Sequence, residues 1–234
     1  MPDDADPPAT ADRLPIATSA SDPAPGLRER NRRTKQRLIR QAARRLFLER
    51  GYEATTLREV AEAADVGFGT VFAYASDKAG LLAMVFVEEL KALPPLFPAD
   101  QRAEDGDLLG ALVAGLAPLY RFWASIPTLS ALVLQQMEFF GANPHMDLIV
   151  ERRAQAKDEL RRWLGREQDA GRIAVHIDTD RAADTLFAIY TSAVREWSAA
   201  TPADPEAGLV RLSRLMELPV RALEAAAEPR RGKA

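Results

Sequence analysis

The amino-acid sequence predicts an all-α protein in two parts, an N-terminal domain of three helices and a larger C-terminal helical domain. Apolar residues make up 47% of the 234 residues but aromatic residues only 7%, and long β-branched runs are rare. This composition favours helices over strands. Apolar residues also recur at the three- and four-residue spacings of helix faces. Prolines at positions 94, 95 and 98 interrupt that pattern after the fourth predicted helix.

Charged residues are distributed unevenly along the chain, which its net charge of −3 does not reveal. Residues 1–27 carry five acidic side chains and one basic one, with many prolines, and we expect a disordered tail. Residues 28–78 carry twelve basic and seven acidic side chains, so positive charge is concentrated in the predicted N-terminal domain. Residues 79–228 form the predicted C-terminal domain, and residues 229–234 a frayed end.

The first predicted helix starts near Arg28 and stops at Gly51, where a glycine commonly ends a helix. Its apolar stripe consists of Leu38, Ile39, Ala42, Ala43, Leu46 and Phe47. Thr56 followed by Glu59 is a capping-box pattern, which predicts the start of a second helix. The apolar face of that helix consists of Leu57, Val60, Ala61 and Ala64.

The segment Asp65-Val66-Gly67 ends the second helix after about two turns, and a short third helix follows to about Ala75. We expect Val71 and Phe72 to point inward from it. A fourth helix begins at Lys78, capped by Ser76 or Asp77. Two short helices joined by a tight, glycine-containing turn are typical of a helix-turn-helix motif.

Five further helices are expected in the C-terminal part. The first two cover about 107–125, kinked at Pro118, and about 127–140. Asn143-Pro144 opens a longer third helix that ends at Gly171, and a connector follows to Ile177. Asp178 and Asp204-Pro205 cap the last two, and the final one is expected to bend at Pro219.

Residues 34–82 resemble the N-terminal domain of the TetR family of bacterial regulators. The resemblance is carried by the runs 34–39, 42–43, 46–47, 51–52, 55–61, 64–67 and 69–72, and by Tyr74, Lys78, Leu81 and Leu82. It implies a helix-turn-helix DNA-binding domain followed by a helical ligand-binding and dimerisation domain. It also implies a homodimer that binds double-stranded DNA at a palindromic operator and responds to a small-molecule effector.

The resemblance assigns DNA contacts to individual positions. Thr56 and Arg58 would contact phosphate or a base edge, Thr70, Tyr74 and Lys78 would contact phosphates, and base contacts fall to Phe68, Gly69 and Ala73. Plainer roles are also open for three of these residues: Thr56 could serve only as a helix cap, Tyr74 could only pack against its neighbours, and Lys78 could be a solvated side chain. The arginines at positions 28, 30, 32 and 33 form either a minor-groove arm or a solvated helix start. The sequence departs from the family at Gly67, often serine, and at Ala75, often aromatic.

In the C-terminal part, large side chains at helical spacing suggest an apolar ligand pocket, although such residues are also ordinary core. The expected pocket residues are Phe122, Trp123, Met137, Phe140, His145 and Tyr190, with Arg121 and Glu138 as polar groups. The helices at about 178–199 and 206–218 would pair with their copies in a four-helix bundle.

Other classes of protein fit less well. The chain has no cysteine and only two histidines, neither in metal-ligand spacing, so we expect no metal, no cofactor and no enzymatic activity. No apolar stretch reaches the roughly eighteen residues of a membrane span, and we expect a cytoplasmic protein without membrane contact. The sequence thus predicts a regulator, by family resemblance a repressor released by a small, largely apolar ligand. A helical interaction module, or an activator without small-molecule control, stays open.

Overall fold

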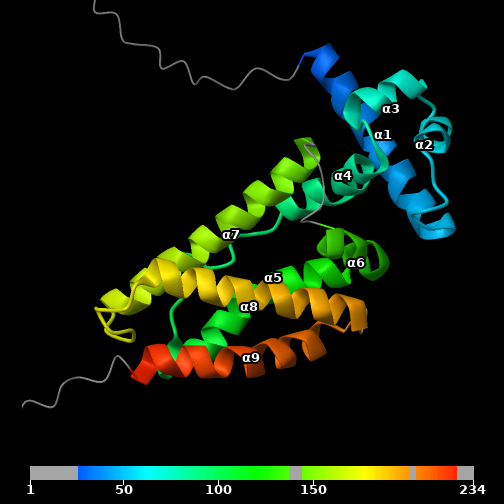
Figure 1. Cartoon of the computed structure of the whole chain (residues 1–234). Helices are drawn as coiled ribbons and strands as arrows, with labels where there is room; N and C mark the ends of the chain where they lie inside the picture. Colours follow the sequence, from blue (N-terminus) through cyan, green and yellow to red (C-terminus); the bar gives the residue numbers. More distant parts are fainter. Residues whose placement is uncertain (1–25, 137–143, 201–203, 226–234) are drawn as a thin grey trace, which may run out of the picture.

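The computed structural model describes residues 26–136, 144–200 and 204–225, and over these residues it contains helices and no strand. The all-α prediction is therefore confirmed. The elements are α1 (Leu27–Arg50), α2 (Leu57–Ala63), α3 (Phe68–Tyr74), α4 (Lys78–Lys91), the one-turn helix η1 (Glu104–Gly106), α5 (Leu108–Ala124), α6 (Pro127–Gln136), α7 (Pro144–Asp169), α8 (Thr179–Ala200) and α9 (Pro205–Ala225). Figure 1 shows α1 to α3 grouped at one end of the molecule, far from α9.

Local capping signals explain where the N-terminal helices begin and end. The backbone N–H of Glu59 donates to the Thr56 hydroxyl (3.3 Å), and the Thr56 N–H donates to the Glu59 carboxylate (2.8 Å), which confirms the capping box. Gly51 follows α1 with a φ of 87°, a conformation that favours glycine. In the turn between α2 and α3 the positive φ belongs to Asp65 (52°), whereas Gly67 has a φ of −63°.

One inward prediction for α3 is wrong. Val71 is fully buried, but Phe72 is 54% exposed. The two side chains are adjacent in sequence, so they lie about 100° apart around a helix. A helix of two turns presents one narrow face to the core, and Val71 occupies it.

Helix α4 connects the two parts of the molecule. It packs against α1 on one side and α7 on the other, and most of its side chains are buried. Asp77 begins it by accepting a hydrogen bond from the Gly80 N–H at 2.7 Å. The predicted domain boundary between residues 78 and 79 falls at the first turn of this shared helix.

The C-terminal part is a bundle in which α5 packs on α9, α7 on α8 and α8 on α9 (Figure 1). Pro118 lies inside α5 and Pro219 inside α9. Asp178 and Asp204 each accept hydrogen bonds from backbone N–H groups at the starts of α8 and α9, as their sequence positions predict. Gly208 allows α9 to approach α5 closely, because a Cβ there would lie 2.6 Å from the Tyr120 ring.

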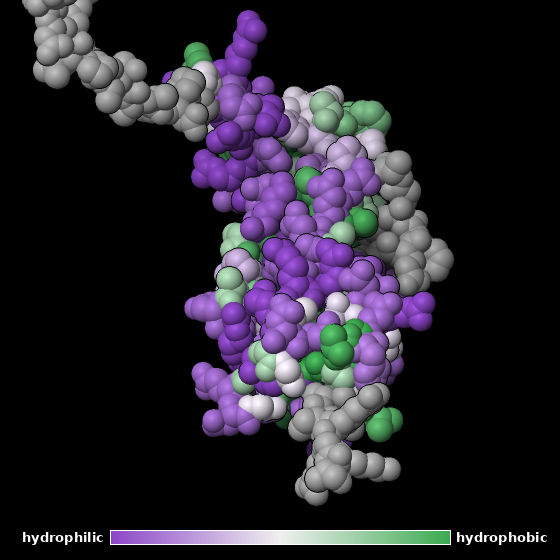
Figure 2. All heavy atoms as spheres, turned by 90° about the vertical axis from the view of Figure 1, so that its left-hand side faces the viewer, coloured by the Kyte–Doolittle hydropathy of each residue, from purple (hydrophilic) through white to green (hydrophobic). Residues whose placement is uncertain are grey.

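The molecular surface and helix lengths give a simple picture of polarity. The face shown in Figure 2 is largely hydrophilic, with apolar residues in scattered groups, and hydrophilic residues gather where α1 begins.

Among the described residues, no single helix has the length and apolar composition of a membrane span. Two bent pairs, α3 with α4 and α5 with α6, reach that threshold only when joined across bends of 65° and 110°.

Candidate nucleic-acid interface and interior cavity

The outward face of α3 carries two exposed aromatic rings. Phe68 is 46% exposed and Phe72 54% exposed, and their ring centroids are 6.3 Å apart. The Arg58 guanidinium at the start of α2 lies 5.9 Å from the Phe68 ring. Gly69 and Ala73 on the same helix are also exposed. The helix therefore presents apolar surface to solvent beside a cation.

A basic groove runs between α1 and α3. Its lining consists of Arg28, Asn31, Arg32 and Lys35 from α1 and Gly69, Thr70, Ala73 and Tyr74 from α3. We call it the α1–α3 groove. The Tyr74 hydroxyl donates a hydrogen bond to the Arg32 carbonyl at 3.0 Å, which joins its two walls. Four of the eight predicted DNA-contacting residues thus lie together, next to three cationic side chains.

Glu29 is the acidic neighbour of these cations. Its carboxylate accepts hydrogen bonds from Arg32 (2.8 and 2.9 Å) and Arg33 (2.8 Å). These contacts lower the pKa of Glu29 to about 2, so the carboxylate is ionised at neutral pH. Arg32 and Arg33 are therefore held in place by one shared exposed carboxylate.

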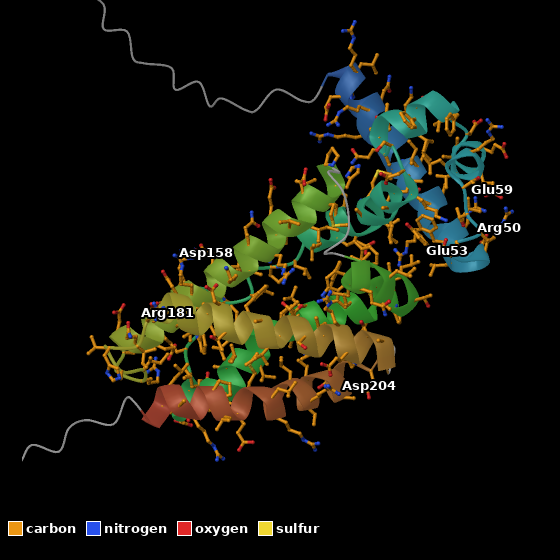
Figure 3. All side chains as sticks on the ribbon, viewed as in Figure 1. Arg50, Glu53, Glu59, Asp158, Arg181 and Asp204 are labelled. Carbon is orange, nitrogen blue, oxygen red and sulfur yellow. The ribbon has the colours of Figure 1, made fainter. Side chains whose placement is uncertain are left out.

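Thr56 and Lys78, both predicted phosphate contacts, bind to protein groups in this structure. The Thr56 cap lowers the pKa of Glu59, chiefly through its backbone hydrogen bond, and Glu59 also pairs with Arg50 at 3.0 Å (Figure 3). The Lys78 ammonium donates to the Glu53 carbonyl at 2.9 Å and lies 4.6 Å from the Tyr52 ring centroid. Glu53 belongs to the loop between α1 and α2, so Lys78 fixes that loop against the start of α4.

His145 lies at the junction of the two parts. Its Nε2 is 2.9 Å from the carbonyl oxygen of Tyr74, the last residue of α3, whereas His145 itself is in the first turn of α7. Burial is the main cause that lowers the pKa of His145. The structure places this predicted pocket residue against α3, away from the cavity described next.

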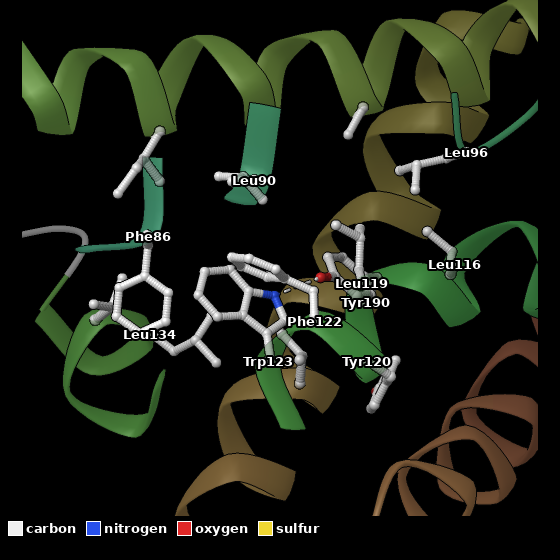
Figure 4. Packing of buried hydrophobic residues seen from close by; sticks show 14 of the residues in the cluster. Phe86, Leu90, Leu96, Leu116, Leu119, Tyr120, Phe122, Trp123, Leu134 and Tyr190 are labelled. Carbon is white, nitrogen blue, oxygen red and sulfur yellow. Dashed lines mark hydrogen bonds between the residues drawn. The ribbon is translucent and has the colours of Figure 1, made fainter. Parts of the chain in front are cut away.

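An interior cavity lies among α4, α5, α6, α7 and α8. Its empty volume, including the open mouth, is about 550 Å³, and its lining consists of Leu90, Leu119, Trp123, Leu134, Ile149, Arg152, Arg153, Ala156, Phe187, Tyr190, Thr191, Val194 and Arg195. The Trp123 indole N–H donates to the Tyr190 hydroxyl at 3.3 Å (Figure 4). Burial raises the pKa of Tyr190, which keeps its hydroxyl protonated at neutral pH.

Of the four predicted pocket residues that the structure describes, Trp123 and Tyr190 line the cavity. Phe122 packs instead on Phe86 and Trp123, with ring centroids 6.0 and 4.8 Å apart. Met137 and Phe140, like the predicted polar residue Glu138, lie outside the described residues. Sequence reasoning missed the arginines of the lining. Arg152 and Arg153 interrupt the apolar face of α7 near Ile149 and Ala156, which is the signal that points to them.

The described residues hold no group of three or more His, Cys, Asp or Glu side chains placed to bind a metal ion. Two sites stand out among the described residues: the α1–α3 groove with the outward face of α3, and the interior cavity. The interior cavity is apolar, with cationic side chains at its edges.

Comparison with known proteins shows what the N-terminal part is similar to. The family model described as bacterial regulatory proteins, tetR family, matches residues 39–85, from the middle of α1 to within α4. The HTH-type transcriptional regulator TcmR of Streptomyces glaucescens is 44% identical over 63 residues. That alignment spans 26% of this chain and 27% of TcmR, about a quarter of each.

Solved structures resemble the chain over most of its length. Thermus thermophilus FadR, a TetR family transcriptional repressor crystallised with lauroyl-CoA, has a TM-score of 0.56 at 23% identity, covering 85% of this chain and 98% of FadR. NalD, the secondary repressor of the MexAB-OprM multidrug efflux pump in Pseudomonas aeruginosa, has a TM-score of 0.56 at 20% identity, covering 83% and 98%. At these identities the likeness shows the fold. Over its N-terminal domain, the chain is similar to the tetR family of bacterial regulatory proteins.

Proposed function

We propose that the protein is a sequence-specific transcriptional regulator that inserts α3 into the major groove of DNA. The observation that carries the proposal is the exposed face of α3, where Phe68 and Phe72 point outward beside the basic α1–α3 groove. Cations of the groove would neutralise phosphates, and the apolar face would contact base edges such as the thymine methyl. The family match at residues 39–85 supports the same function.

The operator is palindromic in this proposal, because the protein acts as a two-fold dimer. Three large apolar residues on α9, Val210, Leu215 and Leu218, are 54%, 43% and 79% exposed. Pairing α8 and α9 with their copies would bury this surface. Two copies of α3 would then read two half-sites one or more helical turns apart.

Repression is released when a small, largely apolar ligand enters the interior cavity. Leu90 of α4 lines that cavity, and only three residues separate the end of α3 from the start of α4. Ile149, Arg152, Arg153 and Ala156 of α7 line it too, while His145 of the same helix contacts Tyr74 of α3. A ligand that displaces α4 or α7 would therefore move α3. A coupling of about 1–3 kcal/mol would lower operator occupancy roughly 5- to 150-fold. Thermus thermophilus FadR, which shares this fold, was crystallised with lauroyl-CoA, a ligand with an apolar acyl chain.

Selection of bound duplexes from a random pool tests the function directly. The expected result is an inverted repeat whose half-sites are separated by whole helical turns. Absence of enrichment over the input pool, with protein folded by circular dichroism, would overturn the proposal.

Salt dependence of binding to the selected duplex tests the phosphate contacts. Lys78→Ala should weaken binding to the selected duplex and to an unrelated duplex alike. It should also make the slope of log affinity against log salt concentration shallower by about one. Lys157→Ala on α7, where the lysine pairs with Asp184 at 2.8 Å, is the matched control and should leave the slope unchanged. A wild-type slope in the Lys78 variant would remove that residue from the interface.

A further inference from the structure

Among the residues that the structure describes, the charged side chains lining the interior cavity all carry the same sign. Arg152, Arg153 and Arg195 contribute guanidinium groups, and no aspartate or glutamate stands among the described lining residues. The remaining side chains are apolar except for the hydroxyls of Tyr190 and Thr191 and the indole N–H of Trp123. The contacts of each arginine decide whether its charge is already compensated.

Arg152 is compensated by a carboxylate. Its guanidinium donates to Glu159 at 3.1 Å, and the two side chains are only 9% and 15% exposed. The other Glu159 oxygen accepts a hydrogen bond from the Leu96 backbone N–H at 2.5 Å. Arg195 donates from Nε to the Leu134 carbonyl at 3.1 Å, which holds it against α6. These two arginines have structural roles.

Arg153 differs from both. Its guanidinium donates to the neutral Thr191 hydroxyl at 3.3 Å and lies 5.8 Å from the Phe187 ring centroid. Within the described ranges, no carboxylate oxygen lies within 4.0 Å of it. The side chain is half-buried at the apolar lining. A guanidinium in such a place is a strong binding partner for a carboxylate, because the fork of N–H donors matches the two oxygens and little water screens the charge.

Tyr190 supplies a second donor to the same cavity. Its oxygen accepts the Trp123 indole hydrogen, and in the described part of the chain nothing accepts its own hydrogen. The rings of Trp123 and Tyr190 and the side chains of Leu90 and Leu119 form an apolar wall beside this donor (Figure 4). As far as the described residues form it, the cavity therefore combines the uncompensated cation of Arg153, the unused hydroxyl donor of Tyr190 and an apolar wall.

We propose that the interior cavity binds an amphipathic organic anion, with its carboxylate on Arg153 and Tyr190 and its apolar body against Trp123 and Leu119. The inference rests on the proposed function only in treating the cavity as the effector site. The anionic group refines the largely apolar effector that the sequence suggests.

The experiment compares three probes that share one ten-carbon chain: decanoate, decan-1-ol and decylammonium. Each is titrated into the full-length protein at pH 7.5, below its aggregation concentration, and binding is measured by isothermal titration calorimetry. Decanoate should bind at least about tenfold more tightly than decanol, because a charge-assisted hydrogen bond is much stronger than a neutral one. Decylammonium should bind more weakly than decanol, since its charge repels the arginines.

Arg153→Gln assigns the preference to one residue. The variant should bind decanol as the wild type does, while its affinity for decanoate falls to within about twofold of decanol. Arg162→Gln is the matched control, because Arg162 lies on the same helix, is 63% exposed and pairs with Asp158 at 3.2 Å. It should keep the full preference. Arg153→Lys keeps the positive charge but lacks the paired N–H donors of the guanidinium, so its preference for decanoate over decanol should be intermediate. That result would show that Arg153→Gln loses the preference because it loses the charge, and not because it misfolds.

Three outcomes would overturn the proposal: equal binding of decanoate and decanol, an undiminished decanoate preference in Arg153→Gln, or no decanoate binding by folded wild-type protein. DNA binding measured without any probe keeps the two proposals distinguishable. If the probe-free wild-type protein shows no sequence-selective DNA binding but binds decanoate in the calorimeter, the regulator function is rejected and the anion site stands.

Discussion

Phe68 and Phe72 expose apolar surface on the outside of α3, whereas Val71 of the same helix is fully buried. The two rings contact one another, and Arg58 lies over one of them, so they form a small ordered group and not two unrelated side chains. Exposed aromatic rings on a helix of seven residues carry a solubility cost with no packing gain in the isolated chain. Contact with thymine methyl groups in the major groove would explain why both rings are exposed on α3.

Replacing Phe72 with alanine tests this role. We expect affinity for the selected duplex to fall roughly fivefold, about 1 kcal/mol for the lost apolar contact, with no change for an unrelated duplex. The melting temperature should barely change, because the side chain is 54% exposed, whereas Val71→Ala should lower it clearly. Fluorescence anisotropy and thermal denaturation provide both readings. Equal weakening on both duplexes would contradict a role in base recognition.

His145 makes stability depend on pH in a defined direction. Burial lowers its folded-state pKa below the unfolded value, opposed by the Tyr74 hydrogen bond, while Lys91 and Glu88 of α4 act in opposite senses. The neutral ring is therefore favoured by folding, so its stabilising effect is complete above the unfolded pKa of about 6.5. That effect is lost as pH falls through the lower folded pKa.

His145→Gln should flatten this dependence, because glutamine can still donate to the Tyr74 carbonyl but does not titrate. Thermal denaturation at pH 7.5 and 5.5 measures the difference. The wild type should lose more stability over this interval than the variant. Parallel losses in the two proteins would show that His145 does not titrate differently in the folded state.

At the level of elements, α9 is seated on α5 through Gly208. An added Cβ would meet the Tyr120 ring at 2.6 Å and the Trp197 side chain at 3.0 Å. Gly208→Ala should therefore destabilise the protein by about 1–3 kcal/mol. Gly165→Ala is the matched control, since Gly165 lies inside α7 with nothing within 4 Å of an added Cβ. It should stabilise by about 0.5–1 kcal/mol. Chemical denaturation measures both, and a neutral Gly208 variant would contradict the close contact.

The element boundaries could be predicted from sequence because short-range chemistry determines them. The Thr56–Glu59 box, the Asp77, Asp178 and Asp204 caps, and Gly51 each act within a few residues. The cavity could not be predicted in the same way. Its lining comes from five helices, so membership depends on how α4, α7 and α8 pack. Phe122 and Trp123 are adjacent and both buried, yet only Trp123 lines the cavity.

At the level of the whole molecule, the proposed dimer uses the exposed apolar residues of α9. Leu218→Glu would put a charge into that interface and should convert the dimer to a monomer of 25.7 kDa. Palindrome binding should weaken with it, because the two half-sites are no longer read together. Val175→Glu, at a 90% exposed position between α7 and α8, is the control and should leave the dimer intact. Light scattering after size exclusion measures the mass of each variant. A Leu218→Glu variant that stays dimeric would show that the interface lies elsewhere.

The whole arrangement depends on α3 meeting DNA with its aromatic face, and photo-crosslinking tests that contact most directly. A benzophenone analogue of phenylalanine at position 72 of the full-length protein should crosslink to the selected duplex on irradiation. The same analogue at position 175 should not. A protein–DNA crosslink at position 72 alone is the expected result. No crosslink there, although the duplex is bound, would contradict the account.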